Sequence, residues 1–178
     1  MKQIIFSGYG GQGLLTLGEI VATIAMRKGK QVTWMPSYGP EMRGGTANCA
    51  VIVSNKLIGS PIVISNIDIL VAMNHPSVTK FLPKMRTGGL VLLNSSIVTE
   101  EISGTDADIV KIDATNIAVK VGDSRAANMV MLAGFLKKTD LFTLDDITAV
   151  IEQRFSKGRG KELIPLNIKA IEAGLEQL

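Results

Sequence analysis

The chain has 178 residues, of which 46% are hydrophobic and 20% are charged. This length and composition predict a single folded domain over residues 1–178 and exclude a disordered chain. The 19 basic and 16 acidic residues leave a net charge of +3, which is too small to indicate nucleic-acid binding.

The chain has one cysteine, Cys49, and one histidine, His75. An iron–sulfur cluster usually needs four cysteine thiolates, and zinc sites need several His or Cys ligands. We therefore expect this chain alone to bind no metal, and we expect Cys49 to be an inert core residue. Met1 and Lys2 lead into a strand-like run without an apolar leader, and no apolar run approaches the ~20 residues of a membrane span. These features predict a cytoplasmic protein without a membrane segment.

The first part of the chain predicts a strand, a helix and a second strand. The apolar run at residues 4–6 is typical of a buried parallel strand. Apolar residues then recur at helical spacing from Leu14 to Ile24, and the helix is expected to run to about residue 28, before Gly29. Residues 31–35 are expected to form a strand that ends before Pro36, with Trp34 in the core. The three elements together are a βαβ unit.

The middle of the chain is expected to add a hairpin and further strands. The run from Thr46 to Val53 favours a strand, and the turn at residues 54–56 is expected to lead into a second arm at residues 57–59. Such a hairpin interrupts the plain alternation of a dinucleotide-binding fold. The remaining expected elements are strands at residues 67–73, 89–94 and 109–112 and a short helix at residues 76–82.

The carboxyl-terminal third is predicted to be helical. Residues 126–136 are apolar nearly all round, which indicates a buried helix. Thr143 and Asp146 form the pattern of a capping box at the start of the next helix. The last helix carries apolar residues from Ile164 to Leu178 at alternating spacings of four and three, and this stripe is expected to pack on the sheet. The predicted fold is therefore α/β and three-layered, with a Rossmann-like, open, mostly parallel sheet, helices on both faces and an inserted hairpin.

Polar and glycine-rich segments follow several of the predicted strands. In such sheets ligands bind outside the carboxyl ends of the strands, so these segments are expected to share one edge. Arg125 and Asn128 lie near the start of the apolar helix and could reach the same edge, although local capping and an Asp123–Arg125 contact explain them equally well. The candidate edge comprises residues 8–13, residues 37–45, Asn74, Asn94, Arg125 and Asn128.

The first of these segments has the glycine spacing of a phosphate-binding turn. Gly8 is expected to allow a tight turn with positive φ, Gly10 and Gly11 to let backbone N–H groups approach an anion, and Gly13 to let the helix pack near the strand. Tyr9 and Gln12 complete the turn. The alternative is a tight strand-to-helix turn that holds no ligand.

The second segment argues against a nicotinamide cofactor. Dinucleotide-binding folds place an acid at the end of the second strand, where this chain has Trp34-Met35-Pro36-Ser37. The following loop is stiffened by prolines and can present several side chains in a fixed array. Arg43 offers a planar fork of donors for a carboxylate or phosphate, and Glu41 could orient it. A well-ordered loop with an internal Glu–Arg pair is the alternative. The candidate residues of this loop are Ser37, Tyr38, Glu41, Met42, Arg43, Gly44 and Gly45.

The two motifs together resemble a known family. Gly8-Tyr9-Gly10-Gly11-Gln12-Gly13, followed by Ser37-Tyr38-Gly39-Pro40-Glu41-Met42-Arg43-Gly44-Gly45-Thr46-Ala47, is similar to the gamma subunit of the 2-oxoacid:ferredoxin oxidoreductases. The second loop is closest to the 2-oxoglutarate type, since the pyruvate and 2-oxoisovalerate types more often show two adjacent basic residues there. Length and element order match the family over essentially the whole chain.

The resemblance implies an oxidoreductase that decarboxylates a 2-oxoacid, reduces ferredoxin and forms an acyl-coenzyme A. It implies that thiamine diphosphate, magnesium and iron–sulfur clusters are held by thiamine-binding alpha and beta subunits and a ferredoxin-like delta subunit. It also implies that the gamma part packs on the thiamine-binding subunits and closes over the coenzyme A side. We accordingly expect no catalytic residue here, an inactive isolated chain, and self-association when its partners are absent. An NAD(P)-linked dehydrogenase and a free-standing nucleotide- or coenzyme A-binding module are the alternatives.

Overall fold

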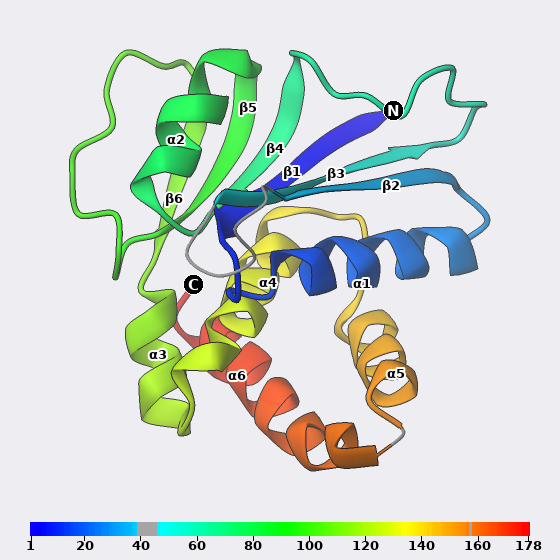
Figure 1. The fold of residues 1–178 in the computed structure, drawn as a ribbon, viewed down its shortest axis with the longest axis vertical. Coiled ribbons are helices and arrows are strands. Elements are labelled where there is room, and N and C mark those ends of the chain that lie inside the picture. Colours follow the sequence, from blue (N-terminus) through cyan, green and yellow to red (C-terminus); the bar gives the residue numbers. More distant parts are fainter. Residues whose placement is uncertain (39–45, 157) are drawn as a thin grey trace.

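A computed structural model describes residues 1–38, 46–156 and 158–178 (Figure 1). The described residues form one six-stranded sheet with the strand order β2-β3-β1-β4-β5-β6. The strands are β1 (Lys2–Tyr9), β2 (Gln31–Tyr38), β3 (Thr46–Ser54), β4 (Ile67–Ala72), β5 (Met85–Asn94) and β6 (Asp108–Ile112). The α-helices are α1 (Leu14–Arg27), α2 (His75–Phe81), α3 (Ala114–Val121), α4 (Ala127–Lys138), α5 (Leu144–Arg154) and α6 (Ile164–Glu176). Short 3₁₀ helices are η1 (Leu82–Lys84), η2 (Ser124–Ala126) and η3 (Gly158–Leu163).

The sheet is mixed, with a single reversed strand among those described. β1, β4, β5 and β6 are parallel neighbours, whereas β3 is antiparallel to both β1 and β2. β2 therefore runs in the same direction as β1. The strand order reverses at β1, because the chain continues to β2 on one side and later to β4 on the other. This topological switch point is where open α/β sheets bind ligands. The prediction of an α/β, mostly parallel, Rossmann-like sheet is confirmed.

The inserted hairpin exists, but the predicted second arm was wrong. β3 pairs along its length with the preceding strand β2, from Gln31 opposite Ser54 to Tyr38 opposite Ala47. Residues 57–59 lie outside any strand, and Leu57 is 88% exposed. The turn signal at residues 54–56 was real, but it ends a strand whose partner comes earlier in the chain.

Helices cover both faces of the sheet, as predicted. α1 and α4 lie on one face and α2 on the other (Figure 1). The larger core lies between the sheet and α1 and α4, where the rings of Phe6 and Phe135 have centroids 6.0 Å apart. Alternation along β1 sends Ile4 and Phe6 to this core and Ile5 to the smaller core beneath α2. None of the helices in the described part of the chain is long and apolar enough to cross a membrane.

The last helix does not pack where it was expected. α6 packs mainly on α4 and α3, so it lies one layer further from the sheet (Figure 1). α4 is apolar on all sides because it faces the sheet on one side and α6 on the other. The two helices approach closely at Gly174, where a Cβ atom would lie 2.7 Å from the Cβ of Ala133.

The edge strand β2 corrects two further expectations. The strand continues through Pro36 to Tyr38 instead of ending at residue 35. An edge strand tolerates proline, since its missing N–H can face away from the neighbouring strand. Trp34 is 40% exposed, not in the core, because β2 has no neighbour on its outer side among the described residues.

Candidate functional site

The glycine turn joins β1 to α1 at the switch point of the sheet. Gly11 and Gly13 have positive φ values of 96° and 73°, and Gly13 is the N-cap of α1. Gly8 lies within β1 and has no positive φ, so its predicted conformational role was wrong. A side chain is excluded there for a different reason, since a Cβ at Gly8 would lie 2.8 Å from the Cβ of Met73 in the segment after β4. The close approach of the two strand ends therefore requires glycine at position 8.

Gln12 closes the turn from within. Its Oε1 atom accepts a hydrogen bond from the backbone N–H of Tyr9 at 2.7 Å, and its own N–H donates to the carbonyl of Tyr9 at 3.2 Å. Gln12 therefore stabilises the conformation of the turn, and its side chain occupies the Tyr9 N–H, which an anion could otherwise use.

The remaining donors of the turn are the backbone N–H groups of its three glycines, Gly10, Gly11 and Gly13. Within the described residues, the N–H groups of Gly10, Gly11 and Gly13 donate to no protein acceptor. No described side chain caps α1, and its first turn contains no acidic residue. The first N–H groups of a helix carry a partial positive charge, so this end of α1 can attract an anion.

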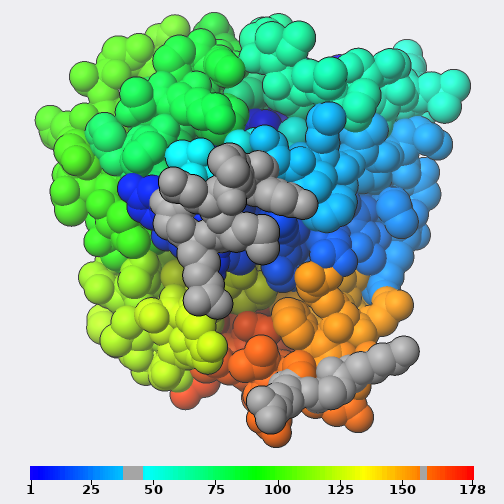
Figure 2. All heavy atoms as spheres, viewed as in Figure 1, coloured from blue at the N-terminus to red at the C-terminus, as the bar shows by residue number. Residues whose placement is uncertain are grey.

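Two hollows flank the turn. One, of about 450 Å³, lies between the turn and the start of β3, and Tyr9, Leu15 and Ala47 are among the residues that line it. The other, of about 220 Å³, lies at the switch point, where Gly11 meets residues after β4 and at the starts of α3 and α4. In Figure 2 the dark-blue amino-terminal segment reaches the surface between green residues above and yellow-green residues below. Residues of the turn thus line both hollows.

The structure brings Asn128 and Arg125 to this edge, as anticipated. Asn128 is buried beneath the turn, and its Nδ2 atom donates to the carbonyl of Gly13 at 3.4 Å. Arg125 lines the smaller hollow, and its Nε and Nη2 atoms donate to Asp123 Oδ2 at 2.9 and 2.6 Å. These hydrogen bonds lower the pKa of Asp123 and raise the pKa of Arg125. The anticipated local Asp123–Arg125 contact is therefore present, and it also holds the guanidinium at the rim of the hollow.

Asn74 and Asn94 lie at the same edge with structural partners. Asn74 caps α2, where its Oδ1 atom accepts hydrogen bonds from the backbone N–H of Ser77 at 2.9 Å and from the Ser77 hydroxyl at 2.6 Å. Asn94 donates from Nδ2 to the hydroxyl of Thr115 at 2.9 Å and thereby ties the end of β5 to α3. Both residues are buried, and within the described residues Asn74 Nδ2 and Asn94 Oδ1 have no partner. These contacts build the edge and do not themselves define a ligand.

The second loop begins and ends beside the glycine turn. Tyr38 pairs with Ala47 across the hairpin, and Ala47 pairs with Gly8 of β1. Ser37 is in the last part of β2, whereas Glu41, Met42, Arg43, Gly44 and Gly45 lie outside the described residues. The strand register therefore places both ends of the loop next to the turn, as the sequence predicted for the two motifs.

Sequence reasoning missed several residues around the smaller hollow. Thr115 lines it, and Ser96 supports the same helix start by accepting hydrogen bonds from the N–H groups of Thr115 and Asn116 at 3.0 and 3.2 Å. Thr115 lies in the first turn of α3 and Ser96 lies just after β5, and α3 is a helix that the sequence pattern did not predict. The usable signal was Asp113 after a strand, followed by a run of helix-compatible residues.

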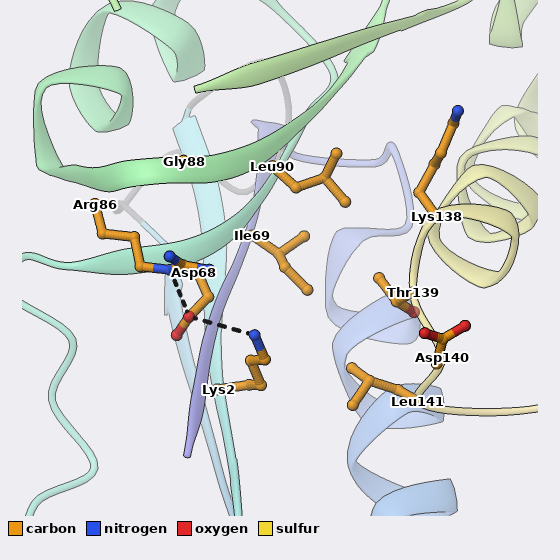
Figure 3. A pocket seen from close by; sticks show the side chains of 10 residues that line it. All are labelled: Lys2, Asp68, Ile69, Arg86, Gly88, Leu90, Lys138, Thr139, Asp140 and Leu141. Atoms are coloured by element: carbon orange, nitrogen blue, oxygen red, sulfur yellow. Dashed lines mark hydrogen bonds and ion pairs between the residues drawn. The ribbon is translucent and has the colours of Figure 1, made fainter. Parts of the chain in front are cut away.

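The opposite edge of the sheet carries another hollow, of about 340 Å³ and lined mainly by polar residues (Figure 3). There the Oδ1 atom of Asp68 accepts a hydrogen bond from Arg86 Nε at 2.8 Å and lies 3.7 Å from Lys2 Nζ. Ile69 from the sheet and Leu141 from the segment after α4 point toward the same gap. We interpret this cluster as an ion-pair clamp on the amino ends of β1, β4 and β5, and place the candidate site at the carboxyl edge.

The cysteine and the acidic residues offer no metal centre in the described residues. Cys49 is fully buried, and burial raises the pKa of its thiol to about 12, so the prediction of a buried core residue is confirmed. His75 is exposed at the start of α2, and its Nδ1 lies 3.3 Å from Glu100 Oε2. Across residues 1–38, 46–156 and 158–178, no three His, Cys, Asp or Glu side chains converge as metal ligands would.

Comparison with known proteins assigns the family. The model of the pyruvate ferredoxin/flavodoxin oxidoreductase family matches residues 3–177. The chain belongs to this family. Its expected resemblance to the family's gamma subunits is confirmed by a solved gamma subunit. The keto/oxoacid ferredoxin oxidoreductase gamma subunit of Geobacter sulfurreducens superposes with a TM-score of 0.83 at 30% identity, over 99% of this chain and 98% of that one.

Two relatives in the family carry different substrate names. The ketoisovalerate oxidoreductase subunit VorA of Methanothermobacter thermautotrophicus is 37% identical over 174 residues, which cover 98% of this chain but 36% of VorA. The 2-oxoglutarate synthase subunit KorC of Methanocaldococcus jannaschii is 32% identical over 178 residues, which cover 98% of this chain and 92% of KorC. The chain thus spans about a third of VorA and nearly all of KorC.

Proposed function

We propose that this chain acts as the gamma subunit of a complex that oxidatively decarboxylates a 2-oxoacid, forms an acyl-coenzyme A and reduces ferredoxin. The observation that carries the proposal is the family match over residues 3–177, together with similarity to gamma subunits of about the same length. With one buried cysteine and one histidine, the chain itself offers no ligand set for a cluster. Thiamine diphosphate, magnesium and iron–sulfur clusters would therefore reside on thiamine-binding alpha and beta subunits and a ferredoxin-like delta subunit, and would supply the redox chemistry.

The glycine turn is the part of the chain proposed to meet a ligand. Three N–H groups of the turn have no acceptor and the start of α1 has no side-chain cap among the described residues, and together with the adjacent hollow they suit a phosphate group of coenzyme A or an acidic side chain of a neighbouring subunit. Arg125 at the rim adds a guanidinium, and Arg43 in the second loop would add another. The chain would then help to close the coenzyme A side of the complex without supplying a catalytic residue.

Two oxoacids are candidate substrates. The residue pattern of the second loop favours 2-oxoglutarate, and similarity to KorC supports the same substrate. The higher identity to VorA favours 2-oxoisovalerate as the second candidate. Ferredoxin reduction by the purified complex, measured with 2-oxoglutarate, 2-oxoisovalerate and pyruvate, separates them by kcat/KM. Activity with none of the three would contradict the proposed function.

The role of the turn is tested in the assembled complex with Gly11→Ala. A Cβ at Gly11 meets no described atom within 4 Å, so the substitution adds backbone strain and places a methyl group beside the N–H groups of the turn without a clash among the described residues. Gly29→Ala is the matched control, since Gly29 also has positive φ and open space but lies at the far end of α1. Loss of one charge-assisted hydrogen bond, worth ~1.5 kcal/mol, predicts a roughly tenfold rise in the KM for coenzyme A for Gly11→Ala alone.

Two other outcomes discriminate among the remaining interpretations. An unchanged KM for coenzyme A with normal assembly would overturn the coenzyme A contact, and loss of assembly by a folded Gly11→Ala chain would instead assign the turn to a subunit interface. Titration of the isolated chain with NADH, NADPH and coenzyme A tests the dehydrogenase and free-standing-module alternatives. Micromolar binding of a reduced nicotinamide would favour the dehydrogenase.

A further inference from the structure

The outer edge of β2 has few of the features with which proteins protect exposed strands. Natural sheet edges are usually short, charged or covered, because unpaired N–H and C=O groups otherwise attract another strand. β6, at the other edge, follows this rule: it has five residues and carries Asp108 and Lys111. β2 has eight residues, none of them charged, and pairs only with β3 within the described chain.

The side chains of β2 favour contact with another apolar strand. Trp34 and Met35 point to opposite faces of the sheet, because successive residues of a strand alternate, and they are 40% and 42% exposed. A strand added to this edge would cover part of both side chains. Pro36 is the one protective residue, since it lacks an N–H group. Pairing is therefore expected to centre on the part of β2 that precedes it.

We propose that the β2 edge pairs with β2 of a second copy of this chain, antiparallel about a two-fold axis. A two-fold contact uses the same surface on both copies, so it needs no second kind of binding surface. Because β2 carries no charge, the two copies bring no like charges opposite one another. The pairing would join two six-stranded sheets into one continuous sheet. A single pair of strands buries little area, so we expect a dissociation constant on the order of micromolar or weaker.

The sole tryptophan of the chain lies on this edge and reports the pairing directly. Light scattering on the 178-residue chain, from micromolar to several hundred micromolar, should show a monomer–dimer transition. The emission of Trp34 should shift to shorter wavelength over the same concentrations. A chain that stays monomeric throughout, or a dimer that forms without a change in Trp34 emission, would overturn the proposal.

A pair of lysine substitutions distinguishes pairing at the β2 edge from non-specific hydrophobic association. Met35→Lys places a charge on the edge strand and should weaken dimerisation at least tenfold. Leu57→Lys makes the same kind of change at an 88% exposed loop residue away from the strand and should leave dimerisation unchanged. Neither side chain is buried, with Met35 42% and Leu57 88% exposed, so unchanged thermal unfolding should show that neither variant loses its fold. Equal weakening by the two variants would overturn the proposal.

Pairing of β2 with a strand of another subunit would give a different experimental result. If a strand of another subunit covers β2, the isolated chain stays monomeric and Met35→Lys reduces its capture by the thiamine-binding subunits. That result would replace the two-fold contact with a contact between different chains. Neither outcome depends on the substrate of the complex, so failure of this inference is distinguishable from failure of the proposed function.

Discussion

Replacing Gly13 with alanine should destabilise the chain through two separable effects. Gly13 has a φ of 73°, and a left-handed conformation costs an L-residue such as alanine about 1–2 kcal/mol. The new Cβ would also lie 3.0 Å from the Cγ atom of Asn128 and closer still to its Nδ2 atom. Asn128 is buried, so it can move only at a cost, and forced repacking of this kind costs about 1–3 kcal/mol. We expect Gly13→Ala to lower the free energy of unfolding by about 2–5 kcal/mol.

A double-mutant cycle with Asn128→Ala distinguishes the two effects. Asn128→Ala alone removes the weak hydrogen bond to the Gly13 carbonyl and the hydrogen bond that Asn128 Oδ1 accepts from the Met129 N–H, and should cost about 1–3 kcal/mol. It also vacates the space that the new Cβ needs, so the double variant should be more stable than the sum of the single effects predicts, by about 1–2 kcal/mol. Urea unfolding of the isolated chain, followed by circular dichroism, measures all four proteins.

Gly11→Ala is the internal control for backbone strain. Gly11 also has a positive φ, but a Cβ there meets none of the described atoms within 4 Å. Its cost should be limited to strain, and it should add to that of Asn128→Ala within about 0.5 kcal/mol. If Gly13→Ala and Asn128→Ala were equally additive, the close contact between the turn and α4 would not be the reason for glycine at position 13.

Three further changes test the packing elsewhere. Asp68→Asn should cost about 0.5–1 kcal/mol in urea unfolding because it removes the charge that pairs with the half-exposed Arg86, whose Nε lies 2.8 Å away, and an unchanged free energy of unfolding would show that the clamp contributes nothing. Gly174→Ala should cost about 1–3 kcal/mol, since its Cβ would lie 2.7 Å from that of Ala133, and an unchanged midpoint of unfolding would contradict the close approach of α4 and α6. The thiol of Cys49 should resist a thiol reagent at pH 8 until the chain unfolds, and rapid reaction of the folded chain would refute its burial. The Cys49 thiol keeps its proton up to about pH 12 in the folded chain, whereas it loses the proton near pH 9.0 in the unfolded chain. The free energy of unfolding should therefore fall between these two pH values by at most ~1.4 kcal/mol per pH unit. Cys49→Ala should abolish this fall.

Signals carried by neighbouring residues could be read from the chain alone. The glycine spacing after a short apolar run predicted a turn between β1 and α1, and the structure has it at residues 10–13. Thr143 and Asp146 predicted a capping box, which is present at the start of α5. In each case the interacting groups lie within a few residues of one another, so local geometry is sufficient to specify the contact.

The candidate site could be predicted only in part for the same reason. The two motifs were placed at one edge because both follow strands, and the register of β3 with β1 and β2 provides the actual link. The closing hydrogen bond from Tyr9 N–H to Gln12 Oε1 depends on a side-chain rotamer that no residue pattern specifies. The start of α3, which completes the smaller hollow, was not foreseen because its helical signal is short.

Contacts between distant segments depended on the packed fold. β3 pairs with β2 and β1 instead of residues 57–59, because its buried side chains continue the core on both faces of the sheet. The apolar stripe of α6 was visible in the chain, but a stripe does not identify the surface that covers it. Gly13 illustrates the limit most clearly, since the residue that crowds it, Asn128, is 115 positions away. Short-range patterns specify elements and turns, whereas the choice of partner depends on which apolar surfaces fit together once all the elements have formed.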